Sequence, residues 1–149
     1  MKATSVFEAR INVLLAGDTG TIDIATGSNV HLIMAPFTPA LGTDFTTLTE
    51  ADFTGSATLA SGFNDQQSFF DPLTNSYVVQ LLEPAGGWHW VATAGTHLPE
   101  TIYGYAVTNT ANTVTYGSAL LPSPVTITST GDAVDIGQVR WSIPVGVMF

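Results

Sequence analysis

The sequence has no cysteine and very little positive charge. Only 3 of its 149 residues are lysine or arginine, whereas 12 are aspartate or glutamate, which gives a formal net charge of −9. Without cysteine there can be no disulfide, no thiolate nucleophile and no zinc–thiolate site. Three basic residues cannot neutralise a phosphate backbone or hold an anionic membrane surface. The composition therefore excludes nucleic acid and membrane as principal partners.

Long apolar segments are lacking as well. A transmembrane helix needs about 20 predominantly apolar residues. Apolar runs such as residues 143–149 are much shorter, and this one is interrupted by Pro144 and Gly146. Near the N-terminus, Glu8 and Arg10 interrupt what would be the apolar core of a secretory signal. We therefore expect neither a leader sequence nor a membrane anchor.

The first 17 residues have the pattern of a short helix. Apolar residues recur with the helical period at Phe7, Ile11, Leu14 and Leu15. Such a stripe is typical of an amphipathic helix. Ser5 and Glu8 have the spacing of a capping box, and Gly17 is a typical stop. The sequence predicts a helical segment over residues 1–17, which either covers one end of its own core or docks on a partner.

The remainder, residues 18–149, carries enough apolar material for one folded core, since 45% of the chain is hydrophobic and only 10% charged. From residue 29 its apolar positions alternate in short runs: Val30, Leu32 and Met34; Tyr77, Val79 and Leu81; Trp88 and Trp90; Tyr103, Tyr105 and Val107; Val114, Tyr116 and Leu120; Val125 and Ile127; Val139, Trp141 and Ile143. A period of two indicates β-strands. The clearest hairpin joins residues 101–109 to 113–120. The sequence predicts an all-β fold, an antiparallel β-sandwich (jelly-roll or immunoglobulin-like) of seven or eight strands.

Three segments are harder to interpret. Val134 and Ile136 fall on one parity, whereas Val139 falls on the other. One extra residue restores the register, so we predict a β-bulge at Gly137. Prolines in residues 122–124 predict a turn or a loop. Residues 47–53 are predicted as one helical turn or a simple loop.

Motifs for nucleophilic catalysis are absent from the sequence. No Gly-x-Ser-x-Gly elbow occurs. Glycoside hydrolysis needs two facing carboxylates, and the acidic residues offer formal pairs such as Glu50 with Asp52 and Asp132 with Asp135. In a chain with so few basic residues, acidic side chains more often serve solubility and repulsion between surfaces. We therefore expect a protein that is not an enzyme.

Among the three histidines, only His97 has another potential metal ligand close by, namely Glu100. Pro99 lies between them and disfavours a helix, so we expect both residues in a loop before the next strand. A divalent-cation site built from loop carboxylates such as Asp18 and Asp23 is an alternative, although their spacing is not diagnostic of one. Phosphate-binding and dinucleotide-binding motifs are absent too. We expect no bound metal and no cofactor.

Trp88, Trp90 and Tyr103 have two possible roles. Aromatic side chains of this size most economically fill a core or its rim. Gathered along a cleft, they could instead stack on sugar rings, which makes them candidate surface residues. A carbohydrate-binding β-sandwich module is therefore an alternative function.

Short segments rich in threonine and glycine run through residues 29–143. They are Thr49–Gly55, Trp90–Thr93, Ile102–Asn109, Thr115–Gly117, Pro124–Ile127 and Ala133–Ile136. In these segments the sequence resembles small virion structural proteins of tailed phages, of the capsid decoration (cement) type. The resemblance implies a non-enzymatic β-rich module that binds the outside of the capsid and stabilises the shell, often as a trimer. It also implies that the major capsid protein and further copies of this chain are the partners.

Apolar residues at both ends of the chain are candidate interface residues. They are Phe7, Ile11 and Leu14 in the predicted helix, and Val145, Val147, Met148 and Phe149 at the C-terminus. A free apolar terminus would be an exposed patch, so we expect it to bury against a neighbouring subunit or the capsid, or to close the core of its own domain. A head- or tail-fibre module that binds a receptor is the alternative within virions.

Overall fold

The computed structural model describes residues 2–3, 28–39, 44–60, 66–81, 84, 86–113 and 115–144. The strands are β1 (Lys2–Ala3), β2 (Ser28–Ile33), β3 (Leu59–Ala60), β4 (Gln66–Asp71), β5 (Ser76–Leu81), β6 (Trp88–Val91), β7 (Glu100–Asn109), β8 (Thr115–Ile127), β9 (Ala133–Ile136) and β10 (Val139–Pro144), with one 3-10 turn, η1 (Phe45–Thr47). Every pairing between these strands is antiparallel. The prediction of an all-β, antiparallel fold is confirmed. Residues 4–17, which hold almost all of the predicted helix, lie outside the described residues.

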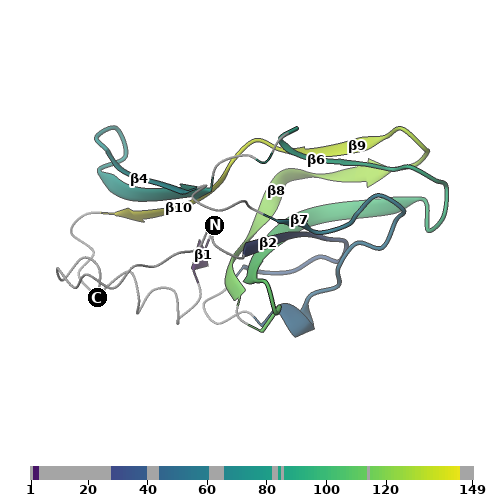
Figure 1. Ribbon diagram of the computed structural model, residues 1–149, viewed down its shortest axis with the longest axis horizontal. Helices are drawn as coiled ribbons and strands as arrows, with labels where there is room; N and C mark the ends of the chain where they lie inside the picture. Colours follow the sequence, from purple (N-terminus) through teal and green to yellow (C-terminus); the bar gives the residue numbers. More distant parts are fainter. Residues whose placement is uncertain are drawn as a thin grey trace.

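The largest sheet has five strands in the order β1-β8-β7-β2-β3 (Figure 1). Its centre is the β7–β8 hairpin, which confirms the hairpin predicted for residues 101–109 and 113–120. The strand β8 nevertheless continues to Ile127, so the turn or loop predicted at residues 122–124 is wrong. The register of the hairpin shifts between Ile102 and Gly104. Such an irregularity accommodates prolines, which cannot donate to a regular ladder.

A two-stranded ribbon, β6–β9, packs on this sheet through alternate side chains. Trp88 and Trp90 of β6, like Val134 and Ile136 of β9, are buried, whereas the residues between them are more exposed. The four buried side chains belong to the same apolar cluster as Val30, Leu32, Ile102, Val107 and Ile127 of the five-stranded sheet. In Figure 1 the ribbon runs along β8 and β7. The period-two pattern of both elements thus places one face of each strand in a shared core.

The bulge predicted at Gly137 is wrong. The strand β9 pairs with β6, whereas β10 pairs with β5 in a different sheet. The chain therefore changes sheets at Gly137 and Gln138. Because the new strand faces a different neighbour, its buried positions start again at Val139, which is completely buried. The change of parity reflects this passage between sheets and not an extra residue within one strand.

The third sheet, β10-β5-β4, forms what we call the arm, residues 66–81 together with 139–144. At its base Leu81 pairs with Val139, and both side chains lie in the common apolar core. From there the arm extends away from the five-stranded sheet, and the β4–β5 turn lies at its end (Figure 1). The arm is thus rooted in the core at one end and presents a hairpin turn at the other.

Residues 44–60 run mainly as extended chain along β2. The turn η1 begins at Asp44, whose side chain accepts a hydrogen bond from the backbone N–H of Thr46. Beyond it, Ala51 N donates to Leu32 O at 2.9 Å. The helical turn predicted for residues 47–53 is therefore wrong in position, while the alternative of a loop describes most of the segment. This loop carries the two carboxylates that build the polar sites described next.

Candidate functional site

Each of the three histidines is paired through its Nδ1 atom with a carboxylate. His31 meets Glu50 at 2.6 Å, His89 meets Asp135 at 2.5 Å and His97 meets Asp52 at 2.6 Å. An ionised carboxylate can only accept, so in each pair the ring donates from Nδ1. The carboxylates of the formal pair Glu50 and Asp52 bind different histidines. Asp132 and Asp135 also have different partners: Asp132 accepts hydrogen bonds from the backbone N–H groups of residues 128 and 129, and Asp135 accepts one from His89.

His31 is the centre of a buried polar network. Its Nε2 atom lies 3.0 Å from Thr108 Oγ1 and 3.1 Å from Asn112 Oδ1. The hydroxyl of Thr58 lies 3.1 Å from Nδ1 on the other side. The ring also contacts Phe45, with 4.3 Å between ring centroids. Both ring nitrogens are therefore occupied within the protein, and His31 ties β2 to the β7–β8 loop and to the loop before β3.

The network also determines the acidity of Glu50. The hydrogen bond from His31 lowers the pKa of the Glu50 carboxyl, and the charge of His31 and the hydroxyl of Thr58 act in the same direction against the effect of burial. A carboxylate that gains hydrogen bonds on folding is stabilised in its ionised form. This site is consequently a structural link that favours an ionised Glu50.

A second site joins His97, Asp52 and Glu100 at the start of β7. Glu100 is only 3% exposed, and its Oε2 atom accepts a hydrogen bond from Asp52 N at 3.3 Å. Burial raises the pKa of Glu100, and the neighbouring Asp52 carboxyl raises it further. The hydrogen bond from His97, followed by one from Glu100, lowers the pKa of Asp52. Of the two acids, Glu100 therefore favours its protonated form, and Asp52 favours the ionised form that accepts from His97.

We predict that Glu100→Gln removes a pH-dependent loss of stability. Because the pKa of Glu100 is raised on folding above its ordinary value of 4.5, the folded state holds a proton that the unfolded state has released. Stability therefore falls as the pH rises from the ordinary value through the raised one. A glutamine amide stays neutral at every pH, and its oxygen can still accept from Asp52 N. The variant should equal the wild type in acid and be more stable at neutral pH by about 1–3 kcal/mol, the cost of an unsatisfied buried polar group.

Glu50→Gln is the control with the opposite sign. The pKa of Glu50 is lowered on folding. The contribution of Glu50 to stability is therefore present above pH 4.5 and is lost as the pH falls through the lowered pKa. Free energies of unfolding should be measured by urea titration between about pH 3 and pH 8. Parallel pH profiles for Glu100→Gln and the wild type would show that Glu100 is ionised in the folded protein, contrary to our assignment.

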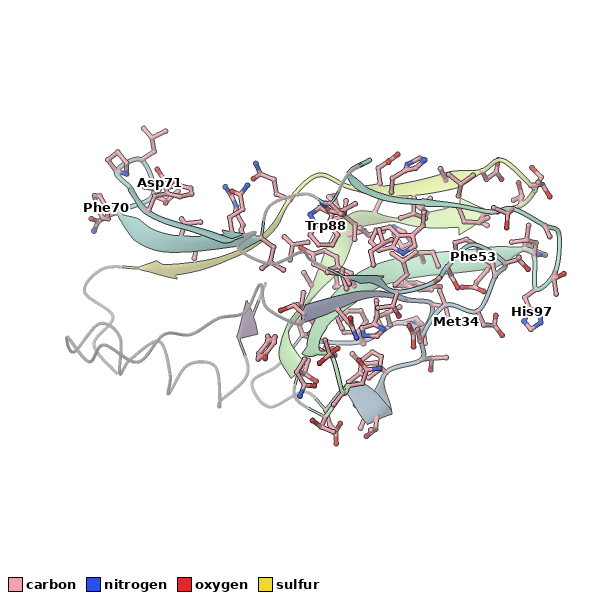
Figure 2. The ribbon with its side chains drawn as sticks, in the orientation of Figure 1. Met34, Phe53, Phe70, Asp71, Trp88 and His97 are labelled. Carbon is pink, nitrogen blue, oxygen red and sulfur yellow. The ribbon has the colours of Figure 1, made fainter. Side chains whose placement is uncertain are left out.

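The predicted aromatic surface is not present as expected. Trp88 and Trp90 are each 1% exposed, so the prediction that they offer a surface to sugars is wrong, and their role as core residues is the correct one. Trp90 Nε1 donates to Ala57 O at 3.0 Å. Tyr103 is half-buried on β7. Figure 2 shows Trp88 inside the molecule, away from its surface.

The most exposed apolar side chains lie on the arm. Leu73 is 94% exposed in the β4–β5 turn, and Phe69 and Phe70 at the end of β4 are 43% and 46% exposed. The turn itself is well braced: Asp71 accepts from Leu73 N at 2.9 Å and from Thr74 Oγ1 at 2.8 Å. These hydrogen bonds, that of the Thr74 hydroxyl first, lower the pKa of Asp71. We call residues 69–73 the arm tip; it presents apolar groups to water in a fixed conformation.

Sequence reasoning missed the arm tip, although a signal is present. Two consecutive phenylalanines directly precede Asp71-Pro72, a turn sequence. Successive residues of a strand point to opposite faces, so one of the two phenylalanines must leave any single buried face. The candidate interface residues Phe7, Ile11, Leu14, Val145, Val147, Met148 and Phe149 all lie outside the described residues.

The described residues contain neither a metal-binding cluster nor a helix that could span a membrane. No group of three or more histidine, aspartate or glutamate side chains in the described part of the chain is placed to hold a metal ion. No helix among the described residues is long and apolar enough to cross a membrane. No protein-family model matches the sequence, and no curated protein or solved structure matches it either. The arm tip and the three histidine–carboxylate pairs are the most distinctive features of the described residues.

Proposed function

We propose that this protein is a non-enzymatic structural protein of a phage virion, which binds the outer capsid surface and stabilises the shell as a decoration protein. The observation that carries this proposal is the arm tip. Leu73 stands almost completely in water although the turn that holds it is fixed by Asp71. Exposed apolar groups on a preorganised element are typical of a protein-binding surface, because their removal from water on binding is favourable and little entropy is lost.

We further infer that the β6–β9 ribbon and the five-stranded sheet are the two layers of a β-sandwich. Support comes from the apolar cluster in which Trp88 and Trp90 of the ribbon pack with Leu32 of β2 and Ile102 of β7. In such an arrangement the interdigitated inner faces form one core. The sandwich would serve as the rigid body from which the arm projects.

The proposed mechanism is binding alone. A capsid repeats each contact many times, so modest contacts made by each copy add up through multivalency. Because the decoration protein binds the assembled shell and not its dissociated subunits, occupancy favours the assembled state by mass action. The acidic loops of the body, with Asp44 and Asp132 among them, are suited to basic surfaces of the major capsid protein. This electrostatic part should weaken as salt is added, whereas apolar contacts should not.

The test is the rupture temperature of shells that carry this protein. We expect shells decorated with the wild-type chain to rupture at a higher temperature than undecorated ones, and Leu73→Ser to lose much of this gain. Leu120→Ser is the matched control, since Leu120 is 49% exposed on β8 and not on the arm. Its shells should rupture at the wild-type temperature, at both low and high ionic strength.

Equal rupture temperatures for decorated and bare shells at confirmed full occupancy would disprove shell stabilisation. A head- or tail-fibre module that binds a receptor would then be the better account. In that case the isolated protein should bind host cells, and Leu73→Ser should weaken this binding more than Leu120→Ser.

A further inference from the structure

The strand β4 forms the outer edge of the arm among the described residues. In the order β10-β5-β4 it pairs with β5 over all six of its residues, from Gln66 to Asp71, and has no described strand on its other side. An edge strand presents backbone N–H and C=O groups that can pair with another strand. Apolar side chains accompany this edge, because Phe69 and Phe70, on opposite faces, are both about half exposed.

Charge within the arm is balanced, unlike charge in the rest of the chain. Its only ionisable acid and base are Asp71 and Arg140, whose charges cancel, so the whole net charge of −9 lies outside the arm. Arg140 also lowers the pKa of Asp71, after the hydrogen bonds of Thr74 and Leu73. Two copies of the chain should therefore repel one another over most of their surfaces, but not at the arm.

We propose that two copies of this chain associate through their arms, with β4 pairing antiparallel to β4 of the second copy about a two-fold axis. The second copy is the occupant favoured by the arm, because the surface is self-complementary: a strand edge that no other described strand covers, apolar groups on both faces and no net charge. A two-fold interface uses the same patch on both copies and closes after two subunits. The proposal names the partner of the arm and so rests on the proposed function, in which the arm is the protein-binding element. The arm tip then acts on the shell by joining two copies, whose acidic loops meet the capsid.

The register follows from side-chain alternation. A two-fold axis perpendicular to the sheet keeps the same face of both β4 strands on the same side. A residue at the axis therefore pairs with the same residue of the second copy. With the axis at Phe69, Phe69 lies opposite Phe69 of the second copy, and Ser68 lies opposite Phe70. Gln67 then lies opposite Asp71, which brings no like charges together. Aromatic cross-strand pairs are among the stabilising ones.

This arrangement also accounts for Leu73 and leaves the bodies well separated. Antiparallel strands place the turn of one arm beside the base of the other. Each Leu73 is therefore expected to be shielded from water by the neighbouring copy. In Figure 2 the labelled Phe70 and Asp71 lie at the end of the arm, and His97 lies at the opposite end of the molecule. The acidic bodies would therefore lie at the two far ends of a six-stranded sheet made by two arms.

Sedimentation equilibrium of the isolated protein tests the association, over about 1 to 100 µM because dimer stability depends on concentration. We expect a monomer–dimer equilibrium that shifts toward dimer as salt is added, since salt screens the repulsion between the bodies. Phe69→Ser and Leu73→Ser should each weaken the dimer at least tenfold with unchanged circular dichroism, and Leu120→Ser should not. A monomer throughout this range, or a trimer, would overturn the proposal.

The absence of cysteine allows a direct test of the register. Phe69→Cys should form a covalent dimer on mild oxidation, because the two residues face one another across the axis. Leu73→Cys and Leu120→Cys should form far less covalent dimer, since in this arrangement each lies far from the same residue of the second copy. If the protein is a dimer but Phe69→Cys cross-links no more than these controls, the pairing along β4 is overturned. A dimer that does not bind shells would leave this inference standing and refute shell binding, whereas a shell-binding monomer would do the reverse.

Discussion

Gly55→Ala should destabilise the protein by about 3 kcal/mol or more, the sum of backbone strain and overpacking. Gly55 has a φ of +115°, in the region that residues with a side chain rarely adopt. A Cβ atom built there would lie 1.9 Å from the carbonyl oxygen of Val91, which is backbone and cannot move aside as a flexible side chain does. The loop would have to separate from the end of β6 and from the chain just after it, where Thr93 N donates to Thr54 O at 2.8 Å.

Gly131→Ala is the matched control for this prediction. Gly131 also has a positive φ, +95°, but a Cβ atom there would meet nothing within 4 Å. Its replacement should therefore show the backbone strain alone, about 1–3 kcal/mol. Chemical denaturation gives the two values, and the slope of the transition shows whether the unfolded state is unchanged. Equal losses at both positions would mean that the contact with Val91 relaxes without cost.

Trp90→Ala should be the most damaging change in the core, with a loss of about 3–5 kcal/mol as for other large-to-small aromatic substitutions. Trp90 is 1% exposed in the cluster shared by the ribbon and the five-stranded sheet. It also donates from Nε1 to Ala57 O, which fastens the loop before β3 to the ribbon. Removal of the ring would leave both a cavity and an unsatisfied carbonyl.

Phenylalanine variants separate these two effects. Trp88 is equally buried, but its Nε1 atom has no hydrogen-bond partner among the described residues. Trp88→Phe should therefore lose ring volume while relieving an unsatisfied donor, whereas Trp90→Phe should lose ring volume and a hydrogen bond. We expect Trp90→Phe to be the less stable variant by about 1–3 kcal/mol. The reverse order, measured by thermal or urea unfolding, would show that the bond to Ala57 contributes little.

The sequence supports the prediction of strands well because their signal is local. Alternation at Trp88 and Trp90, or along the β7–β8 hairpin, needs only a few consecutive residues to be recognised. The same alternation does not reveal which surface covers the apolar face. For this reason Trp88 and Trp90 could be assigned either to a core or to a sugar-binding surface, and only the position of β6 on the five-stranded sheet decides the question.

The polar sites could not be predicted from the sequence for a related reason. His97 meets Asp52 from 45 positions away, and His89 meets Asp135 from 46 positions away. Such pairs depend on the register of loops and strands that a single sequence does not specify. The predicted bulge at Gly137 failed similarly, because a local pattern cannot distinguish an extra residue in one strand from a passage between two sheets.

That passage between sheets has a mechanical consequence. At Gly137 and Gln138 the chain passes from β9 to β10, whose six residues pair with β5 from Val139 opposite Leu81 to Pro144 opposite Ser76. A tensile load applied at the arm tip and resisted by the body is carried along the direction of these strands. The pairs between β5 and β10 are then loaded in shear and share the force, instead of opening one after another from an end. An arm anchored in this way resists a steady outward pull better than its few strands would suggest.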